Sequence, residues 1–196
     1  MRLFAAVNFS DPVRRSLARV AARLAKAGLP VRWTSEEAFH LTLRWLGDRE
    51  DDDRAVVTAI LYEVAAGFEP FEAGFGPVGA FPSPRRPRVI WIAVEGGARL
   101  RLLRDELEHR LARGGFGRDE RSFHPHVTLG RVRRGSQAAD FRPFVSLSAD
   151  IGVGVSFPVS SVDLMRSHLH RDGARYERLA AVALGPDGLP ADEPPA

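Results

Sequence analysis

Two stretches of the chain decide its fold and its chemistry: His40-Leu-Thr-Leu-Arg-Trp-Leu-Gly47 and Phe123-His-Pro-His-Val-Thr-Leu-Gly-Arg131. Each contains the tetrapeptide His-x-Thr-Leu, although the whole sequence has only six histidines and four threonines. With this composition one copy is expected roughly 0.01 times by chance. Two copies therefore indicate a duplicated functional element.

Both stretches alternate apolar and polar residues, which is typical of half-buried strands. Residues i and i+2 of a strand point to the same face, so each histidine lies beside the threonine of its motif. On the polar face we expect His40, Thr42 and Arg44 in the first strand, and His124, His126 and Thr128 in the second. On the opposite face of the first strand we expect Leu41, Leu43 and Trp45.

The elements around these motifs predict an α+β fold with a duplicated, pseudo-two-fold arrangement, because strands and helices mix without strict alternation. We expect one domain over residues 1–184, followed by a flexible tail at 185–196 that is rich in Pro, Gly and acidic residues. Helices are predicted at residues 13–27, 53–68 and 99–113, and strands at 2–9, 31–34, 40–46, 71–81, 89–94 and 123–132. A strand pair is predicted at 144–155, and a closing hairpin at 162–169 and 176–184, turned at Asp172-Gly173.

Composition excludes several kinds of chemistry. The 196 residues contain no cysteine, which removes thiolate nucleophiles, disulfides and Cys-ligated metals. Lys26 is the only lysine and fits neither a phosphate-cradling Gly-Lys-Ser/Thr loop nor a nucleotidyl-accepting site, so we expect no ATP chemistry. No apolar run approaches the ~20 residues of a membrane span. We expect a cytoplasmic protein that does not bind membranes.

Arginine dominates the basic residues, and the net charge is +3. Arginine suits planar, bidentate contact with phosphate, so nucleic acid is a candidate partner. An arginine-rich composition is also a property of some whole proteomes, and these residues are spread along the chain. The sequence therefore defines no basic patch.

Two facing motif strands would place two imidazoles and two hydroxyls around one phosphorus atom. An in-line displacement at phosphorus needs a base on one side and an acid on the other. Histidine suits both tasks because its ordinary pKa is about 6.5. The duplicated motif therefore predicts a phosphodiester-cleaving site, and the motifs alone leave open which imidazole is acid and which is base.

A zinc site is the main competing interpretation, because His124-Pro-His126 and His168-Leu-His170 are two His-x-His pairs. It leaves the His40 motif unexplained and offers no clear carboxylate ligand, so we expect no metal. We expect His124 to support His126 through a hydrogen bond, and His109, His168 and His170 to face solvent.

The two motif stretches resemble the paired signatures of the 2H phosphoesterase superfamily. The nearest branch is that of the RNA 2',3'-cyclic phosphodiesterases, historically named 2'-5' RNA ligases (LigT-like). Arg2-Leu-Phe-Ala-Ala-Val7, Val89-Ile-Trp-Ile-Ala-Val94 and the Gly173-Ala-Arg-Tyr176 hairpin extend the resemblance over nearly the whole chain. It implies a bilobal fold, with two pseudo-symmetric lobes of antiparallel sheet, helices outside and a central cleft.

The resemblance also implies an activity: metal-independent and cofactor-free opening of RNA 2',3'-cyclic phosphate ends to 2'-phosphomonoesters, with reversible ATP-independent 2'-5' ligation. It assigns His40 as the general acid and His126 as the base, with Thr42, Thr128 and Arg131 binding the phosphate. For Phe39 and Phe123, base stacking is conceivable, but packing is the expected role. We expect a monomer.

Two other functions fit the same motifs. The site could act on 2'-5' oligoadenylates or small cyclic nucleotides, which a panel of substrates would distinguish. Alternatively, the protein could be a non-enzymatic module that binds RNA ends, which would bind cyclic-phosphate RNA without turnover. The completeness of both motifs argues against the second.

Overall fold

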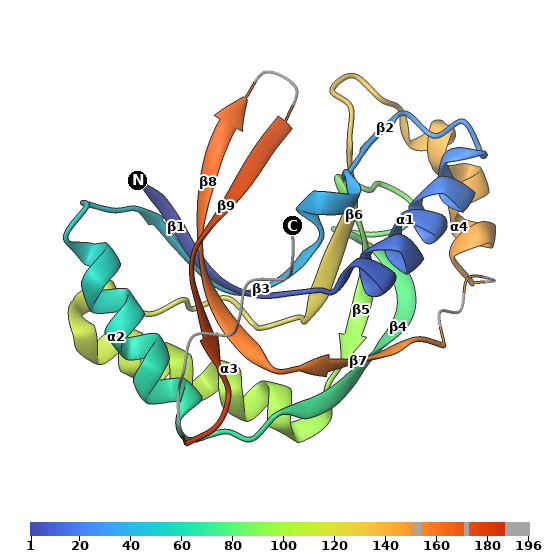
Figure 1. Cartoon of the computed structure of the whole chain (residues 1–196). Helices are drawn as coiled ribbons and strands as arrows, with labels where there is room; N and C mark the ends of the chain where they lie inside the picture. Colours follow the sequence, from blue (N-terminus) through green and yellow to red (C-terminus); the bar gives the residue numbers. More distant parts are fainter. Residues whose placement is uncertain (150, 152–153, 171–172, 187–196) are drawn as a thin grey trace.

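A curled, nine-stranded sheet forms the framework of the protein in the computed structural model, which describes residues 1–149, 151, 154–170 and 173–186 (Figure 1). Every strand pairing recorded in it is antiparallel. The strand order is β7-β4-β5-β6-β3-β1-β8-β9, and the short β2 pairs with β6. The strands are β1 (Arg2–Asn8), β2 (Val31–Trp33), β3 (His40–Asp48), β4 (Phe71–Phe81), β5 (Val89–Glu95), β6 (His126–Val132), β7 (Ser156–Val159), β8 (Ser161–His170) and β9 (Gly173–Ala183).

The sheet consists of two lobes that meet where the motif strands β3 and β6 pair. Only one residue pair, Leu41 with Val127, is recorded between these strands in the described residues. One lobe contains β3, β1, β8 and β9, and the other contains β6, β5, β4 and β7. The predicted α+β fold with two antiparallel lobes is therefore confirmed.

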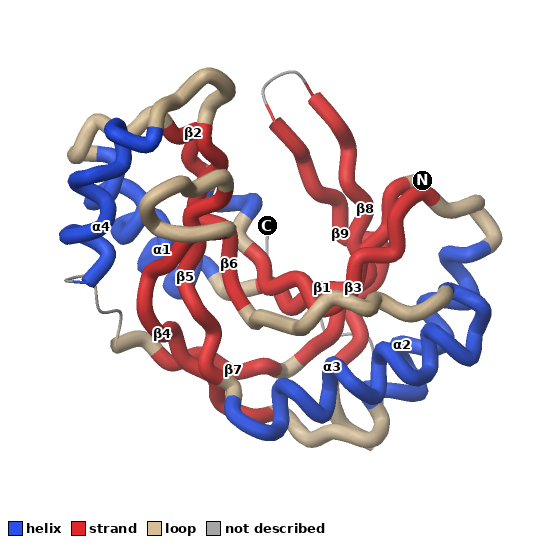
Figure 2. Tube along the Cα trace, turned by 180° about the vertical axis from the view of Figure 1, so that it is seen from behind, coloured by secondary structure: helices blue, strands red, loops and turns tan. Residues whose placement is uncertain are grey.

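Two helices cover each lobe, as Figures 1 and 2 show from opposite sides. The helices α2 (Asp53–Ala65) and α3 (Gly97–Leu111) pack against each other, and α2 also contacts β8 and β9. The helices α1 (Asp11–Ala25) and α4 (Arg142–Ala149) belong to the other lobe, where α1 contacts β2 and β6, and α4 contacts β4. The helices lie outside the sheet and leave the face with the motif side chains open.

The two faces of strand β1 pack into different clusters, one in the main core and one beneath the open face that carries the motif side chains. Leu3, Ala5 and Val7 belong to the main core, whereas Phe4 and Ala6 form a small second cluster with Met165. A strand buried on both faces reads as a continuous apolar run, which explains the sequence of β1.

A β-bulge follows the threonine of each motif. Leu43 has no partner in the register between β1 and β3, and Leu129 has none in the register between β5 and β6. A bulge inserts one residue and so reverses the facing of the residues beyond it. The strict alternation predicted for residues 40–46 is therefore wrong: Arg44 is buried and Trp45 lines the open face.

The prediction of a strand pair at residues 144–155 is also wrong, because residues 142–149 form α4. Phe141 and Phe144 are both buried, which is helical spacing, and a 3-10 turn over Ala138–Phe141 leads into the helix. The hairpin of β8 and β9 is confirmed, while Asp172 of its predicted turn lies outside the described residues. So does most of the predicted tail, at residues 187–196.

A glycine allows β2 to approach β6. A Cβ atom on Gly130 would lie 2.5 Å from Val31 Cγ1 and 3.1 Å from the Arg32 carbonyl oxygen. We expect Gly130→Ala to lower the free energy of unfolding by about 1–3 kcal/mol, because the added methyl group overpacks this contact. Denaturant titration would measure the change. Gly154→Ala, where a Cβ meets no atom within 4 Å, is the matched control, and equal losses in both variants would contradict the explanation.

Candidate active site

A cleft of about 800 Å³ lies between the two lobes and is lined by residues of both motifs. All five residues predicted for the site line it: His40, Thr42, His126, Thr128 and Arg131. The polar residues thus come from two strands that are separated by about half of the sequence and joined by one pairing.

The register of that pairing sets the geometry of the site. Since Leu41 lies opposite Val127 in an antiparallel pair, one further step in each direction sets His40 opposite Thr128 and Thr42 opposite His126. Each imidazole then has a threonine beside it on its own strand and another across the strand pair. By this register the two histidines are diagonal neighbours across the strand pair, and so are the two threonines.

Both imidazoles are oriented by the same backbone contact. His40 Nδ1 lies 2.9 Å from the carbonyl oxygen of Ala38, and His126 Nδ1 lies 2.6 Å from that of His124. A carbonyl only accepts, so Nδ1 carries the proton and donates in both rings. In the neutral ring Nε2 is then free to accept a proton, and in the charged ring it donates one. His124 supports His126 as predicted, but through its backbone carbonyl, which an i−2 spacing could not reveal.

Aromatic rings surround both histidines and limit their access to water. The His40 ring lies 4.9 Å from Phe4 and 4.7 Å from Tyr176, and the His126 ring lies 5.1 Å from Phe81, between ring centroids. Burial lowers the pKa of His40 to about 4, and the charges of His126 and Arg131 act in the same direction. Burial also lowers the pKa of His126, again with help from Arg131. In the free protein, neutral imidazoles are therefore favoured.

Arg131 lies at the rim of the cleft, opposite Arg32 in the pairing of β6 with β2. The bulge at Leu129 turns its side chain to the same face as Thr128. Its side chain is exposed, so the guanidinium can reach an anion held between the imidazoles. Trp45 occupies the equivalent position of β3 and lines the opposite end of the cleft.

Several cleft residues were not predicted from the sequence. Trp33 reaches the cleft because β2 pairs with β6, and Phe81 because it ends β4 opposite Val89 of β5, which in turn lies opposite Arg131 of β6. Tyr176 belongs to the hairpin stretch already noted in the sequence, and its spacing to Gly173 was the available signal. Phe39 is buried as predicted, whereas Phe123 lines the cleft beneath the guanidinium of Arg104.

The remaining histidines lie outside the cleft apart from His124, which lines it. His109 and His170 are exposed, as predicted. His168 is partly exposed and contacts Glu177, with Nε2 2.8 Å from Oε2. Among the described residues, no three histidine or acidic side chains gather in a way that could hold a metal ion.

A sequence profile of the 2'-5' RNA ligase superfamily matches residues 9–171. The chain belongs to this superfamily. It is 38% identical over 173 residues to an RNA 2',3'-cyclic phosphodiesterase of Aeropyrum pernix, covering 88% of this chain and 97% of the relative. A second protein of that name, from Methanothermobacter thermautotrophicus, is 31% identical and covers 94% of this chain and 99% of its own.

Solved structures support the same relationship. TT0787 of Thermus thermophilus superposes with a TM-score of 0.77 at 26% identity, covering 94% of this chain and 98% of its own. E. coli LigT complexed with 3'-AMP superposes with a TM-score of 0.69 at 25% identity, covering 93% of this chain and 97% of its own. The LigT-like fold predicted from the motifs is therefore confirmed.

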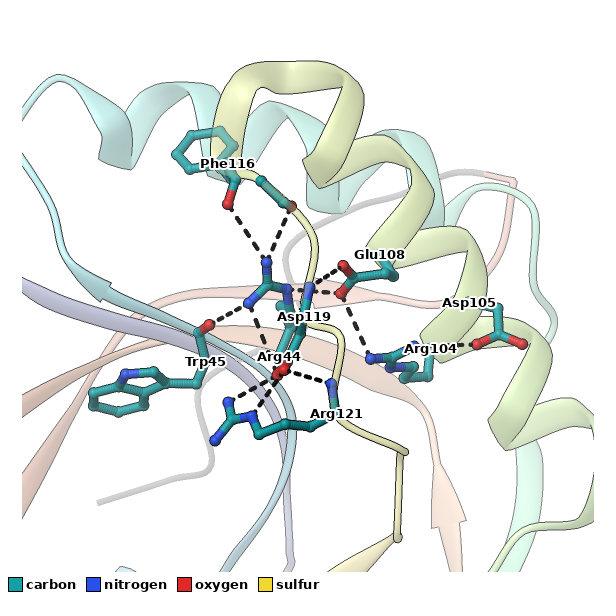
Figure 3. A network of polar contacts seen from close by, with 9 residues as sticks. Arg44, Trp45, Arg104, Asp105, Glu108, Phe116, Asp119 and Arg121 are labelled. Carbon is teal, nitrogen blue, oxygen red and sulfur yellow. Dashed lines mark hydrogen bonds and ion pairs between the residues drawn. The ribbon is translucent and has the colours of Figure 1, made fainter.

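In this superfamily member, a buried arginine ties the first motif strand to the segment before the second (Figure 3). Arg44 Nε lies 2.7 Å from Glu108 Oε2 of α3, and the guanidinium donates to the carbonyls of Trp45 and Gly117. Glu108 Oε1 in turn accepts the backbone N–H of Asp119 at 2.7 Å. The Arg44 side chain therefore fixes residues 117–119 relative to β3.

The network continues from Asp119 into the cleft wall. Arg121 donates to both carboxylate oxygens of Asp119, each at 2.8 Å, and these bonds lower the pKa of Asp119 to about 2. Asp119, Arg121 and Phe123 all line the cleft. Arg44, which was predicted to share the face of His40, thus lies on the opposite face of the sheet. There it positions the segment that leads to His126.

Removing this arginine should destabilise the protein strongly. We expect Arg44→Met to lower the free energy of unfolding by about 3–5 kcal/mol, because the largely buried Glu108 carboxylate loses its nearest charge partner and keeps only Arg104, at 3.7 Å. Arg44→Met combined with Glu108→Gln should recover part of that loss, since residue 108 then carries no charge and Arg104 keeps its contact with Asp105. Denaturant titration of both variants measures the difference. A double variant as unstable as the single one would show that the charge of Glu108 is not the cause.

Proposed function

We propose that this protein hydrolyses the 2',3'-cyclic phosphate ends of RNA to 2'-phosphomonoesters. The observation that carries the proposal is the pair of imidazoles, each fixed through Nδ1 to a backbone carbonyl and both lining one cleft with Thr42 and Thr128. The relatives named RNA 2',3'-cyclic phosphodiesterase support the choice of substrate.

The reaction would be a displacement at phosphorus with one proton transfer on each side. His126 Nε2 takes a proton from water while the water oxygen bonds to phosphorus. The bond from phosphorus to the 3'-oxygen breaks, and His40 Nε2 gives its proton to that oxygen. The products are a 3'-hydroxyl and a 2'-phosphomonoester, with the proton now on His126 in place of His40.

Thr42, Thr128 and Arg131 would bind the non-bridging oxygens of the phosphate. Neither threonine hydroxyl makes a hydrogen bond to another described residue, so both are available to the substrate. Arg131 would supply charge-assisted hydrogen bonds from the rim. Donors aimed at the oxygens that gain charge stabilise the transition state more than the ground state.

The substrate itself would help to charge the acid. Burial opposes protonation of His40 in the free protein, but an anionic phosphodiester beside the ring favours the imidazolium. The proton needed by the leaving group is thus best held when substrate is bound.

The same groups can also join two RNA ends, with the bond from phosphorus to the 3'-oxygen broken and that oxygen protonated by His40 as in hydrolysis. A 5'-hydroxyl in place of water would attack the 2',3'-cyclic phosphate and give a 2'-5' linkage without ATP. One chain supplies every group named here, so the mechanism requires no second copy and no metal. Within the described residues no helix is long and apolar enough to cross a membrane. The cytoplasmic location stays a prediction.

Substitution of either imidazole should stop turnover. We expect His40→Gln and His126→Gln each to reduce kcat on a 2',3'-cyclic nucleotide by about 10²–10⁴-fold, because each removes one proton transfer. Product separation by chromatography measures the rate and distinguishes 2'- from 3'-phosphate. His109→Gln on the exposed face of α3 is the control, and excess EDTA should leave wild-type turnover unchanged. Near-normal rates in either cleft variant would refute the proposal.

The pH dependence should be displaced towards acid. Activity rises as pH passes the pKa of the base and falls as pH passes the pKa of the acid, and kcat/KM reports both values in the free enzyme. Both pKa values are lowered from 6.5, so we expect the maximum of kcat/KM below pH 6.5. Arg131→Met should move both limbs to higher pH, because its charge lowers both pKa values, while Arg99→Met should not. A wild-type maximum above pH 7 would contradict this assignment.

A further inference from the structure

A second hollow lies at the end of the lobe that contains β4, β5 and β6, and arginines border it. It has a volume of about 650 Å³, and its lining includes Arg86, Arg88, Arg133 and Arg134. The buried ring of Phe141 and the side chain of Gln137 line it as well. All four arginine side chains are exposed.

Three neighbouring backbone segments bring these arginines together. The amide of Val132 donates to the carbonyl of Arg88 at 3.0 Å, and the amide of Arg133 donates to that of Pro30 at 2.9 Å. The β4–β5 connection, the end of β6 and the start of β2 therefore lie side by side at one end of the sheet, as Figure 2 shows.

This arginine group continues from the cleft. Arg131 lines the cleft and the next three residues of the chain, Val132 to Arg134, line the second hollow. At the rise of an extended chain, Arg131 and Arg133 are about 7 Å apart. A strand whose terminal phosphate lies between His40 and His126 could therefore pass over Arg131 and continue onto this surface.

These charges are not neutralised by neighbouring carboxylates. None of the four arginines makes an ion pair with another residue in the part of the chain that the structure describes. Elsewhere several arginines are paired, including Arg44 with Glu108 and Arg110 with Glu63. What distinguishes this hollow is that four guanidinium groups border it and no Asp or Glu is among the described residues that line it.

We propose that Arg86, Arg88, Arg133 and Arg134 form a second binding site, for the sugar-phosphate backbone of the RNA that precedes the cyclic phosphate end. Guanidinium groups bind phosphate by bidentate hydrogen bonds and need no particular base. The inference rests on the proposed function and extends it: the protein distinguishes an RNA strand from a cyclic mononucleotide by contacts outside the cleft.

The test compares a short and a long substrate. We expect Arg88→Gln/Arg133→Gln to leave kcat/KM on a 2',3'-cyclic mononucleotide within twofold of wild type. On a cyclic-phosphate oligonucleotide of about ten residues, kcat/KM should fall roughly tenfold at low salt. The slope of log kcat/KM against log salt should become shallower by about 1.4, because two phosphate contacts are lost. Arg99→Gln/Arg101→Gln on the exposed surface of α3 removes equal charge and should change neither substrate.

A binding measurement separates this inference from the proposed activity. Fluorescence anisotropy with a labelled oligonucleotide that ends in a 3'-hydroxyl needs no catalysis, and its affinity should fall in Arg88→Gln/Arg133→Gln alone. Equal affinity and equal salt slopes in wild type, this variant and the α3 control would overturn the second site, and would point to a partner other than RNA. Failure of the wild type to hydrolyse the cyclic mononucleotide would overturn the proposed function instead.

Discussion

The antiparallel pairing of Leu41 with Val127 is the constraint on which the rest of the site depends. It joins a lobe of four strands to a lobe of five, in which β2 pairs with β6, and fixes the register of the two motif strands. A shift of one residue would turn the histidines and threonines of one strand to the buried face. Since both leucine-rich backs of these strands are packed into one core, such a shift would expose that core, and burial therefore maintains the alignment of the polar groups.

The sequence predicted what depends on local pattern. The two motifs, their strands, the cleft-lining histidines and threonines and the closing hairpin all follow from alternation and repetition. Arg44 and Trp45 were predicted on the wrong faces because a bulge depends on pairing with the partner strand. The sequence of β3 alone contains no signal for it. Residues 144–155 were misread because a short apolar stretch fits both a strand and one face of a helix, and the buried Phe141 that decides between them lies outside it.

The ion pairs below the sheet lay beyond sequence reasoning for a similar reason. Arg44, Glu108 and Asp119 come from three separate segments, and only the fold brings them together. Their arrangement shows how one lobe can influence the other. The side chain that follows the first motif holds the backbone that precedes the second, so the two imidazoles share a support beneath the sheet as well as the pairing within it.

The matching bulges make the two motif strands alike as far as Leu43 and Leu129. Two residues further on, the equivalent positions that line the cleft hold Trp45 on one side and Arg131 on the other. Two equivalent imidazoles alone would accept a phosphodiester in either of two opposite orientations, because each could act as acid or as base. A flat apolar ring and a cation at these two positions make the cleft asymmetric, so that the proposed substrate would bind with its nucleotide and its phosphate in one orientation. The direction in which the bond breaks would then be set by this difference between two equivalent positions of the cleft.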